Sequence, residues 1–338
     1  EGKLASAHVR DLLGGITCEI RAKQFLNAAG PWVDDIRRMD DPSSQPCVRP
    51  TKGVHLVFAR TALPVRESLV LADERRRIVF VMPHDRYVLV GTTDTDFTGD
   101  PASVRTEIAD VEYLLAVLAE SLPGIKLTNA DVATSFAGLR ALVREKDGSS
   151  PSSVPREQVI LESASRLITV AGGKFTTHRE IAQQVVNLVM KRLRRPAGIC
   201  PTLTTPFPGA RPLDAGEGAV MRTIPAASAE ILTARYGTRA PIVARIASRR
   251  PELAQPLSRG CPALGAEVVN AVANEMAHSV GDFLIRRTSL SWRAPVEAEA
   301  AAPAVARIMA AELGWDRARE EAEIAGFTHE QQSRRVVA

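Results

Sequence analysis

The chain has 338 residues, of which 45% are hydrophobic, so we expect roughly two domains with enough apolar side chains for buried cores. Its net charge is only +4, because 43 lysines and arginines nearly balance 39 aspartates and glutamates. With 4% aromatic residues and no Cys/His finger or RNA-binding signature, the composition excludes nucleic acid as an expected partner.

The N-terminal residues predict strands followed by a helix. Ala7–Leu13 and Thr17–Ala22 flank two glycines and indicate a hairpin. Gln24–Ala28 is the next predicted strand, and it is followed by the small residues Ala29 and Gly30. Such an ending is typical of the edge where an open α/β sheet binds a nucleotide, although an ordinary turn accounts for the same residues.

The middle of the chain is rich in β-branched and aromatic residues, which predicts an antiparallel sheet over about residues 49–171. Its predicted strands are Val54–Phe58, Ile78–Met82, Tyr87–Gly91, Asp131–Val143 and Gln158–Glu162. An amphipathic helix is expected at Thr106–Leu122. Asp94 and Asp96 are predicted turn residues that hydrogen-bond their own backbone.

A further predicted strand, which ends at residue 171, leads into a two-glycine turn and a helix start. Gly172 and Gly173 can adopt backbone angles that other residues resist, and the hydroxyls of Thr176 and Thr177 are expected to cap the helix. This arrangement directs backbone N–H groups and the positive end of a helix dipole to one point, beside Lys174. We therefore predict an anion site here, with an ordinary capped turn as the alternative.

Five prolines between residues 196 and 216 disfavour both helix and central strand, so this stretch is a predicted linker. The following residues are alanine-rich and have apolar stripes at helical spacing. The predicted helices are Ala226–Tyr236, Ile242–Ser248, Glu267–Arg286, Ala300–Leu313 and Asp316–Ala325. We expect an α/β region over 1–195, a linker over 196–216 and a helical domain over 217–338.

Four basic side chains are candidates for catalysis or binding. Arg140 lies in an otherwise apolar segment, where a guanidinium is costly to bury without an acidic partner or ligand. Lys174 and Arg156 can neutralise an anion, but a solvated surface position explains each of them as well. His55, on a predicted strand, is either a structural residue or a proton acceptor.

The cysteine and hydropathy patterns favour a cytoplasmic protein. The four cysteines lie far apart and form no CxxC pair, so neither a zinc site nor a disulfide framework is indicated. The chain has no apolar run of about 18 residues and no signal-peptide pattern, so any membrane contact would be peripheral, through arginine clusters such as Arg192–Arg195. Because the chain opens at Glu1 without methionine, we expect it to be a piece of a longer protein.

Six segments between Leu26 and Ala182 carry motifs in a fixed order. They are LNAAGPWVDDI (Leu26–Ile36), RPTKGVHLVF (Arg49–Phe58), RIVFVMPHDRYVLVGTTDTDFTGDP (Arg77–Pro101), SFAGLRALV (Ser135–Val143), PREQVILE (Pro155–Glu162) and LITVAGGKFTTHREIA (Leu167–Ala182). Together they resemble the FAD-dependent glycerol-3-phosphate dehydrogenases that pass electrons to quinone. EMAHSVGDFLIRRTSL (Glu275–Leu290) is similar to the helical C-terminal domain of those enzymes. Amino-acid oxidases share the AAGPW-like and AGG-like turns, whereas KGVH and GGKFTT favour the glycerophosphate branch.

The resemblance implies FAD as the cofactor, with two groups of contacts. The pyrimidine end of the flavin would contact the glycine turn and helix start, at Gly172, Gly173, Phe175, Thr176 and Thr177. The nucleotide portion would lie near Ala29, Gly30 and Trp32. The helix dipole at the turn would stabilise the negative charge that develops as the flavin takes up a hydride.

The resemblance also implies sn-glycerol 3-phosphate as the substrate, oxidised at C2 to dihydroxyacetone phosphate, with a quinone as electron acceptor at the membrane. Arg140, Arg156 and Lys174 would converge on the phosphate, whose charge of about −1.5 to −2 suits such a cluster. His55 would take the hydroxyl proton, so that His55, Arg140 and Lys174 form the catalytic group. A homodimer stays an open alternative to a monomer.

The chain departs from the family pattern in two places. Gly138-Leu139-Arg140-Ala141 stands where the family has Gly-Leu-Arg-Pro, and no GxGxxG follows a strand. We therefore expect an α+β fold: an FAD-dependent oxidoreductase core of the glutathione-reductase or D-amino-acid-oxidase type that lacks its first βαβ unit, followed by an all-helical C-terminal domain. The alternatives are an inactive truncated fragment that binds phosphate esters weakly, and a related FAD-dependent amine or amino-acid oxidase.

Overall fold

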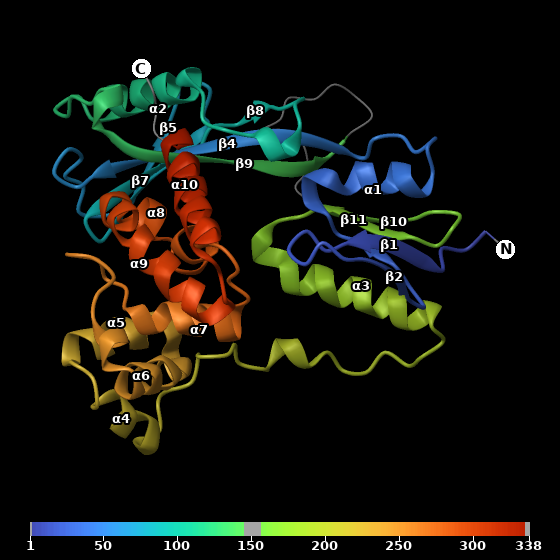
Figure 1. Ribbon diagram of the computed structural model, residues 1–338. Coiled ribbons are helices and arrows are strands. Elements are labelled where there is room, and N and C mark those ends of the chain that lie inside the picture. Colours follow the sequence, from blue (N-terminus) through green and yellow to red (C-terminus); the bar gives the residue numbers. More distant parts are fainter. Residues whose placement is uncertain (1, 145–156, 335–338) are drawn as a thin grey trace. The chain divides into compact units, whose positions relative to one another are not determined.

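The computed structural model describes residues 2–144 and 157–334, and contacts divide the chain into two compact units (Figure 1). The first unit consists of Glu1–Val54, Thr93–Val104 and Ala137–Thr204, and the second of His55–Thr92, Arg105–Phe136 and Thr205–Ala338. Two long strands, β4 (Val48–Ala59) and β9 (Val132–Val143), contribute residues to both units. The domain boundaries expected at residues 195 and 216 stay a prediction.

The first unit holds a small mixed sheet. Its strands, in spatial order, are β10 (Gln158–Glu162), β11 (Ile168–Gly172) and β3 (Leu26–Asn27). β10 is antiparallel to β11, whereas β11 and β3 are parallel. The two parallel strands lead through the turns η1 (Gly30–Trp32) and η5 (Phe175–Thr177) into the helices α1 (Val33–Asp40) and α3 (His178–Arg192). Figure 1 shows α1 and α3 on opposite sides of this sheet.

The apolar core of the first unit joins α1 to the strands beside it. Val33 at the start of α1, Val48 at the start of β4 and Ala171 near the end of β11 are buried and pack together. Small and β-branched side chains let the helix approach the strands closely, so this contact fixes where the helix begins. The same unit contains the antiparallel hairpin of β1 (Ser6–Arg10) and β2 (Thr17–Arg21), as predicted.

The sheet of the second unit is an antiparallel meander. Its strands, in spatial order, are β5 (Leu69–Ala72), β6 (Ile78–His84), β7 (Tyr87–Gly91) and the C-terminal part of β4. Val79, Val81, Val88 and Val90 are fully buried and alternate with more exposed neighbours, as expected where one face of a sheet is covered. The predicted amphipathic helix is present as α2 (Ile108–Ser121).

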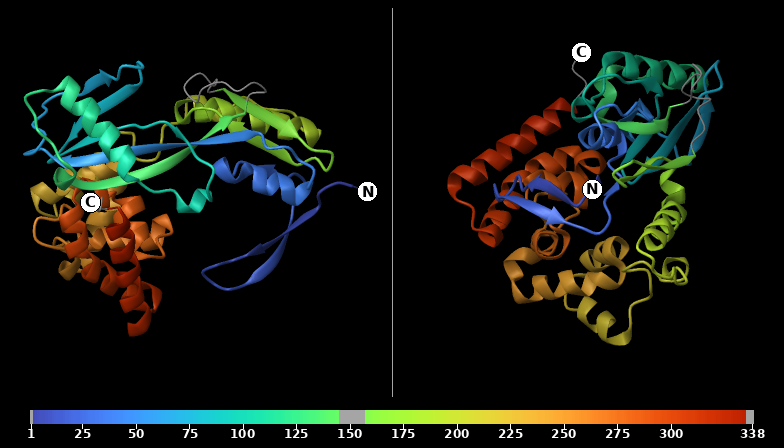
Figure 2. Two further views of the ribbon diagram at one scale, coloured as in Figure 1. Left: turned by 90° about the horizontal axis from the view of Figure 1, so that it is seen from above. Right: turned by 90° about the vertical axis from the view of Figure 1, so that its right-hand side faces the viewer.

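The rest of the second unit is helical (Figure 2). Its α-helices are α4 (Ala215–Met221), α5 (Ala226–Tyr236), α6 (Ala240–Arg249), α7 (Gly265–Glu275), α8 (Leu290–Arg293), α9 (Pro295–Leu313) and α10 (Arg317–Ser333). α7 packs against both α6 and α9, and α10 packs on α9. Within 2–144 and 157–334, no helix is long and apolar enough to cross a membrane.

One predicted helix is wrong, because Glu267–Arg286 is not continuous. α7 ends at Glu275, and a separate π-helical turn follows at Asp282–Arg287. Met276 has a left-handed φ of 54°, and the guanidinium of Arg287 donates hydrogen bonds of 2.8 and 2.6 Å to the carbonyl oxygen of Glu275. That contact satisfies an orphan carbonyl at the helix end, and the apolar spacing of the sequence does not reveal it.

Candidate active site

Two adjacent parallel strands of the first unit each lead into a glycine turn and a helix start. Because β3 and β11 are parallel, their carboxyl ends lie at the same edge of the sheet. Gly30, after β3, has a φ of 57°, and Gly172 and Gly173, at the end of β11, have φ of 72° and 86°. These angles favour glycine. Two helix N-termini beside each other at a sheet edge form a site suited to an anionic ligand.

The glycines of the β11 turn are also required for space. A Cβ on Gly172 would lie 2.6 Å from the backbone carbonyl oxygen of Glu157, and a Cβ on Gly173 would lie 2.5 Å from Cδ1 of Ile181. By contrast, a Cβ on Gly30 would have no described atom within 4 Å. The β11 turn is therefore packed tightly against β10 and α3, whereas Gly30 faces open space.

The predicted hydroxyl caps are wrong. The Thr177 hydroxyl donates to the carbonyl oxygen of Lys174 at 3.0 Å, and no side chain of the described residues caps the start of η5 or α3. Two backbone N–H groups of this helix start already donate to carbonyl oxygens, that of Thr177 to Lys174 at 3.1 Å and that of His178 to Phe175. Thr176 is exposed beside them, and Phe175, which is 88% exposed, stacks on the ring of His178.

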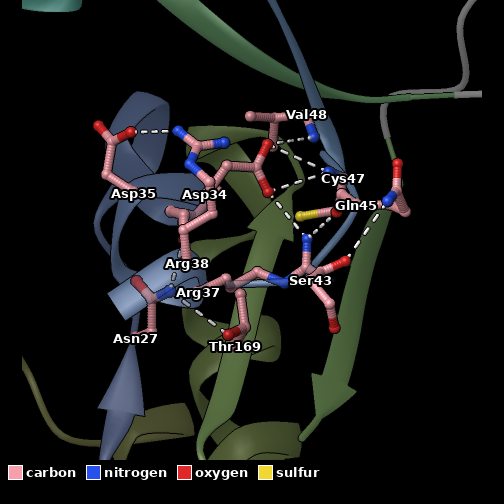
Figure 3. Close-up of polar contacts among 11 residues, drawn as sticks. Asn27, Asp34, Asp35, Arg37, Arg38, Ser43, Gln45, Cys47, Val48 and Thr169 are labelled. Carbon is pink, nitrogen blue, oxygen red and sulfur yellow. Dashed lines mark hydrogen bonds and ion pairs between the residues drawn. The ribbon is translucent and has the colours of Figure 1, made fainter. Parts of the chain in front are cut away.

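A buried amide holds the other helix start against the sheet (Figure 3). Asn27 donates to the carbonyl oxygen of Val33 at 2.9 Å and to the Thr169 hydroxyl at 3.3 Å. Its side-chain oxygen accepts a 3.2 Å hydrogen bond from the N–H of Ala29. Asn27 thereby ties β3, the turn and β11 together, and Trp32 lies 42% exposed at the end of this turn. Contact of Ala29, Gly30 and Trp32 with a cofactor stays a prediction.

Asp34, in the first turn of α1, fixes the start of β4 (Figure 3). Its carboxylate accepts hydrogen bonds from the N–H groups of Cys47 at 2.9 Å and Val48 at 3.1 Å, and from Arg37 at 2.8 Å. Burial acts to raise the pKa of Asp34, but these donors outweigh burial and hold the pKa below its usual range. Sequence reasoning missed this residue, although an acidic residue in the first turn of a helix is a signal for such a role.

Arg140, on β9, lies against Gly53 of β4. A Cβ on Gly53 would be 2.6 Å from Nη2 and 2.7 Å from Nη1 of the guanidinium, so a larger residue at 53 would displace the guanidinium. The guanidinium donates to the Asp94 carboxylate and to the Thr93 carbonyl oxygen, each at 3.3 Å. The sequence predicted either a partner or an acidic ligand for Arg140, and Asp94 is such a partner. Its side chain is 29% exposed.

The turn role predicted for Asp94 and Asp96 is wrong. Asp94 pairs with Arg140, and Asp96 accepts two hydrogen bonds of 2.6 Å from Arg49. The hydrogen bonds from Arg49 also lower the pKa of Asp96. Asp96 lies in the short strand β8 (Thr95–Asp96), which pairs with β4. The two carboxylates thus orient two arginines of the first unit.

The remaining predicted phosphate ligands are less constrained. Lys174 lies exposed immediately before η5, in the same unit as Arg140. Arg156 lies outside the described residues. The convergence of Arg140, Arg156 and Lys174 on one phosphate stays a prediction.

His55 belongs to the second unit and is half-buried on β4. It lies opposite Gly91 of β7 in the sheet register, and its ring stacks on Phe136 with centroids 5.0 Å apart. Neither neighbour was identified from the sequence, since the pairing depends on strand register. In the described ranges no cluster of three or more histidine, cysteine or acidic side chains is arranged to hold a metal ion.

Comparison with known proteins shows two matching segments. Residues 4–188 match the family model of FAD dependent oxidoreductases, and residues 200–320 match the C-terminal domain of alpha-glycerophosphate oxidase. The aerobic glycerol-3-phosphate dehydrogenase of Staphylococcus haemolyticus is 34% identical over 308 residues, which cover 85% of this chain and 54% of that protein. The probable mitochondrial glycerol-3-phosphate dehydrogenase of Dictyostelium discoideum is 32% identical over 339 residues, covering 95% of this chain and 52% of that protein.

A solved structure gives the same result for the fold. The glycerol-3-phosphate dehydrogenase from Bacillus halodurans, complexed with FAD, aligns with a TM-score of 0.83 and 29% identity, covering 99% of this chain and 67% of that one. The chain spans about half the length of the curated relatives it matches. The expected α+β fold, an oxidoreductase core followed by a helical domain, is confirmed. The chain therefore belongs to the FAD dependent oxidoreductase family, among the members related to glycerol-3-phosphate dehydrogenases.

Proposed function

We propose that this protein oxidises sn-glycerol 3-phosphate to dihydroxyacetone phosphate with FAD as cofactor. The names of its relatives support this proposal. The observation that carries it is Arg140, whose guanidinium is oriented by Asp94 and Thr93 over Gly53 and whose side chain is 29% exposed. An oriented planar guanidinium is suited to a phosphate, because it can donate two parallel charge-assisted hydrogen bonds.

The residues of the first unit fit an FAD molecule. The helix starts after β3 and β11 lie at one sheet edge, and no described side chain caps η1, η5 or α3. Their helix dipoles suit the negatively charged parts of the cofactor. We assign Gly172, Gly173, Phe175, Thr176 and Thr177 to the flavin, and Ala29, Gly30 and Trp32 to the nucleotide portion.

The proposed chemistry divides between two side chains and the cofactor. The imidazole of His55 accepts the proton of the C2 hydroxyl as the C2–H bond breaks and the C=O double bond forms. Arg140, with Lys174 and Arg156, holds the phosphate so that C2 is correctly oriented. FAD, when bound, supplies the acceptor for the hydride that leaves C2.

The electron acceptor and the location belong to the same proposal. A quinone acceptor is supported by relatives that are named aerobic dehydrogenases. We further propose a cytoplasmic location, with peripheral membrane contact through the arginine clusters and a homodimer as the assembly. In the presence of the protein, glycerol 3-phosphate should reduce a soluble quinone analogue. Flotation with anionic vesicles tests the membrane contact, and light scattering tests the homodimer.

The flavin spectrum of the protein tests the proposed activity. After incubation with FAD and removal of free cofactor, the protein should show flavin absorbance that glycerol 3-phosphate bleaches without oxygen. Bleaching by glycine or another amino acid instead would favour the amine or amino-acid oxidase alternative. Failure to retain flavin would contradict the proposal and favour a fragment that binds phosphate esters only.

Substitutions of the phosphate ligands give a second test. Arg140→Ala and Lys174→Ala should each raise the KM for glycerol 3-phosphate by about tenfold or more, because each removes a charged hydrogen bond to phosphate. An unchanged KM in both variants would exclude the assigned phosphate site.

A further inference from the structure

The ring of His55 contacts two residues of the second unit. On one side, Phe136 of β9 stacks on the imidazole, with centroids 5.0 Å apart and ring planes 15° from parallel. In addition, a Cβ on Gly91 would lie 2.3 Å from Cδ2, 2.7 Å from Cγ and 2.8 Å from Nε2 of the imidazole. The imidazole therefore lies directly on the backbone of Gly91, and any larger residue at 91 would displace it.

Strand register produces this arrangement. His55 and Gly91 are direct partners across β4 and β7, so the imidazole covers the glycine opposite it. A glycine inside a strand weakens it by about 0.5–1 kcal/mol relative to alanine, and it marks a place where another group approaches the backbone closely. Here the approaching group is the imidazole of His55.

Phe136 is supported in turn by the helical segment. Trp292 of α8 contacts the Phe136 ring at a centroid distance of 6.3 Å and the His84 ring at 5.6 Å. The neighbouring Ser135 is anchored through its N–H and its hydroxyl, which both donate to the carbonyl oxygen of Arg334 at 2.9 Å. The helical segment thus holds the residue that stacks on His55.

Two ion pairs also join the helical segment to the turn between β6 and β7, near the rings of Phe136, Trp292 and His84. Arg293 donates to the Asp85 carboxylate at 2.9 Å, and Arg86 donates to Glu297 at 2.7 Å. Exposed ion pairs of this kind contribute little free energy, but they restrict how α8 and α9 lie on the turn. These two ion pairs therefore fix the helix end that carries Trp292.

We propose that Phe136 and Trp292 are positioning residues for His55, and that one task of the helical C-terminal segment is to orient this imidazole for proton transfer. The inference rests on the proposed function, in which His55 accepts the hydroxyl proton. A ring that packs on a backbone and stacks on an aromatic side chain keeps one rotamer, and so its nitrogen keeps one distance to the substrate oxygen. Neither Phe136 nor Trp292 needs to touch the substrate.

Three substitutions and one matched control test the inference. Phe136→Leu removes the stacking ring, and Trp292→Leu removes its support while leaving Phe136 in place. Phe136→Tyr keeps the stack and should behave as the unmodified protein does. Trp315→Leu is the control, because Trp315 is partly buried against the core of the same helical segment and contacts Arg319.

Two readouts separate positioning from loss of structure. Turnover with glycerol 3-phosphate should fall by about 10- to 100-fold in kcat for Phe136→Leu, with KM unchanged within about twofold, because misorientation affects the chemical step. The ring proton resonance of His55, assigned with His55→Gln in histidine-labelled protein, should lose the upfield ring-current shift that Phe136 causes. Trp292→Leu should show both effects in weaker form, and Trp315→Leu should show neither.

The outcomes distinguish this inference from the proposed function. An unmoved His55 resonance in Phe136→Leu and Trp292→Leu would overturn the positioning role and leave the proposed function intact. A moved resonance with unchanged kcat would also overturn it, and would remove His55 from the proposed reaction. Equal effects in Trp292→Leu and Trp315→Leu would show a general loss of helical packing, which contradicts a specific role for Trp292.

Discussion

Arg140 and His55 share a local feature, because each side chain lies against a glycine of a neighbouring strand. A Cβ on Gly53 would overlap the Arg140 guanidinium, and a Cβ on Gly91 would overlap the imidazole of His55. Glycine inside a strand costs stability, so the space it leaves must serve another purpose. At both positions that purpose is the placement of a polar side chain close to the sheet.

Gly53→Ala should therefore weaken substrate binding without altering Arg140 itself. The added methyl displaces the guanidinium from Asp94, and we expect the KM for glycerol 3-phosphate to rise by about tenfold or more. Gly138→Ala is the matched control, because a Cβ there would meet no described atom within 4 Å. Steady-state kinetics give the KM for glycerol 3-phosphate in both variants. Equal KM values in Gly53→Ala and Gly138→Ala would contradict the role of Gly53.

At this scale the sequence indicates the type of residue but not its partners. A guanidinium among apolar residues predicted an acidic partner for Arg140, and Asp94 is that partner, 46 residues away in the chain. Asp94 itself was misassigned to a turn, because Asp in a Thr-Asp-Thr-Asp run satisfies turn preferences as well as pairing. Phe136 beside His55 could not be predicted, because cross-strand neighbours depend on register.

At the scale of helices and strands, the carboxylate of Asp34 stabilises the junction of α1 and β4. Asp34 accepts hydrogen bonds from two backbone N–H groups and from Arg37. Asp34→Asn keeps the size of the side chain but replaces an acceptor oxygen with a donor. We expect the free energy of unfolding at neutral pH to fall by roughly 1.5–3 kcal/mol, measured by urea denaturation.

The difference in stability between the unmodified protein and Asp34→Asn should depend on pH. Because the folded pKa of Asp34 is lowered, its stabilisation is complete above about pH 4, the ordinary pKa of aspartate, and is lost as the pH falls through the lower folded value. The gap between the two proteins should shrink in acid. Asp35→Asn, which affects an exposed pair with Arg38, should change stability by no more than about 0.5 kcal/mol. A gap that is equal at pH 7 and pH 2 would contradict this account.

The break after α7 allows a stabilising substitution. Met276 has a left-handed backbone and is 77% exposed, so glycine removes strain and loses little packing. Met276→Gly should raise the free energy of unfolding by about 0.5–1 kcal/mol in thermal denaturation. Ala325→Gly, at an exposed position inside α10, should lower it by about 1 kcal/mol. Destabilisation by Met276→Gly would show that the methionine side chain makes a contact that matters.

Element types were predictable where periodicity was strong, and boundaries were not. The predicted bounds Ala226–Tyr236, Tyr87–Gly91 and Gln158–Glu162 agree with the structure. β4 is Val48–Ala59 instead of Val54–Phe58, since its polar first half pairs with β8 and lies in the sheet. Pairing of that kind follows from tertiary context and leaves no hydrophobic alternation in the sequence.

At the scale of the whole molecule, each compact unit combines segments that are distant in sequence. The second unit joins the β5–β7 meander to the helical segment, although more than 100 residues separate them in the chain. The family matches divide the chain differently, at residues 4–188 and 200–320. The helical segment is thus tied to strands of the oxidoreductase core, which is the basis for its proposed effect on His55.

The central claim is that Arg140 binds the substrate and His55 takes its proton. Stopped-flow measurement of flavin reduction by glycerol 3-phosphate, without oxygen, separates these roles in Arg140→Lys and His55→Asn. Arg140→Lys should raise the half-saturating substrate concentration by about tenfold while the limiting rate changes little. His55→Asn should lower the limiting rate by about 100-fold or more, with half-saturation nearly unchanged. A limiting rate in His55→Asn equal to that of the unmodified protein would contradict the account.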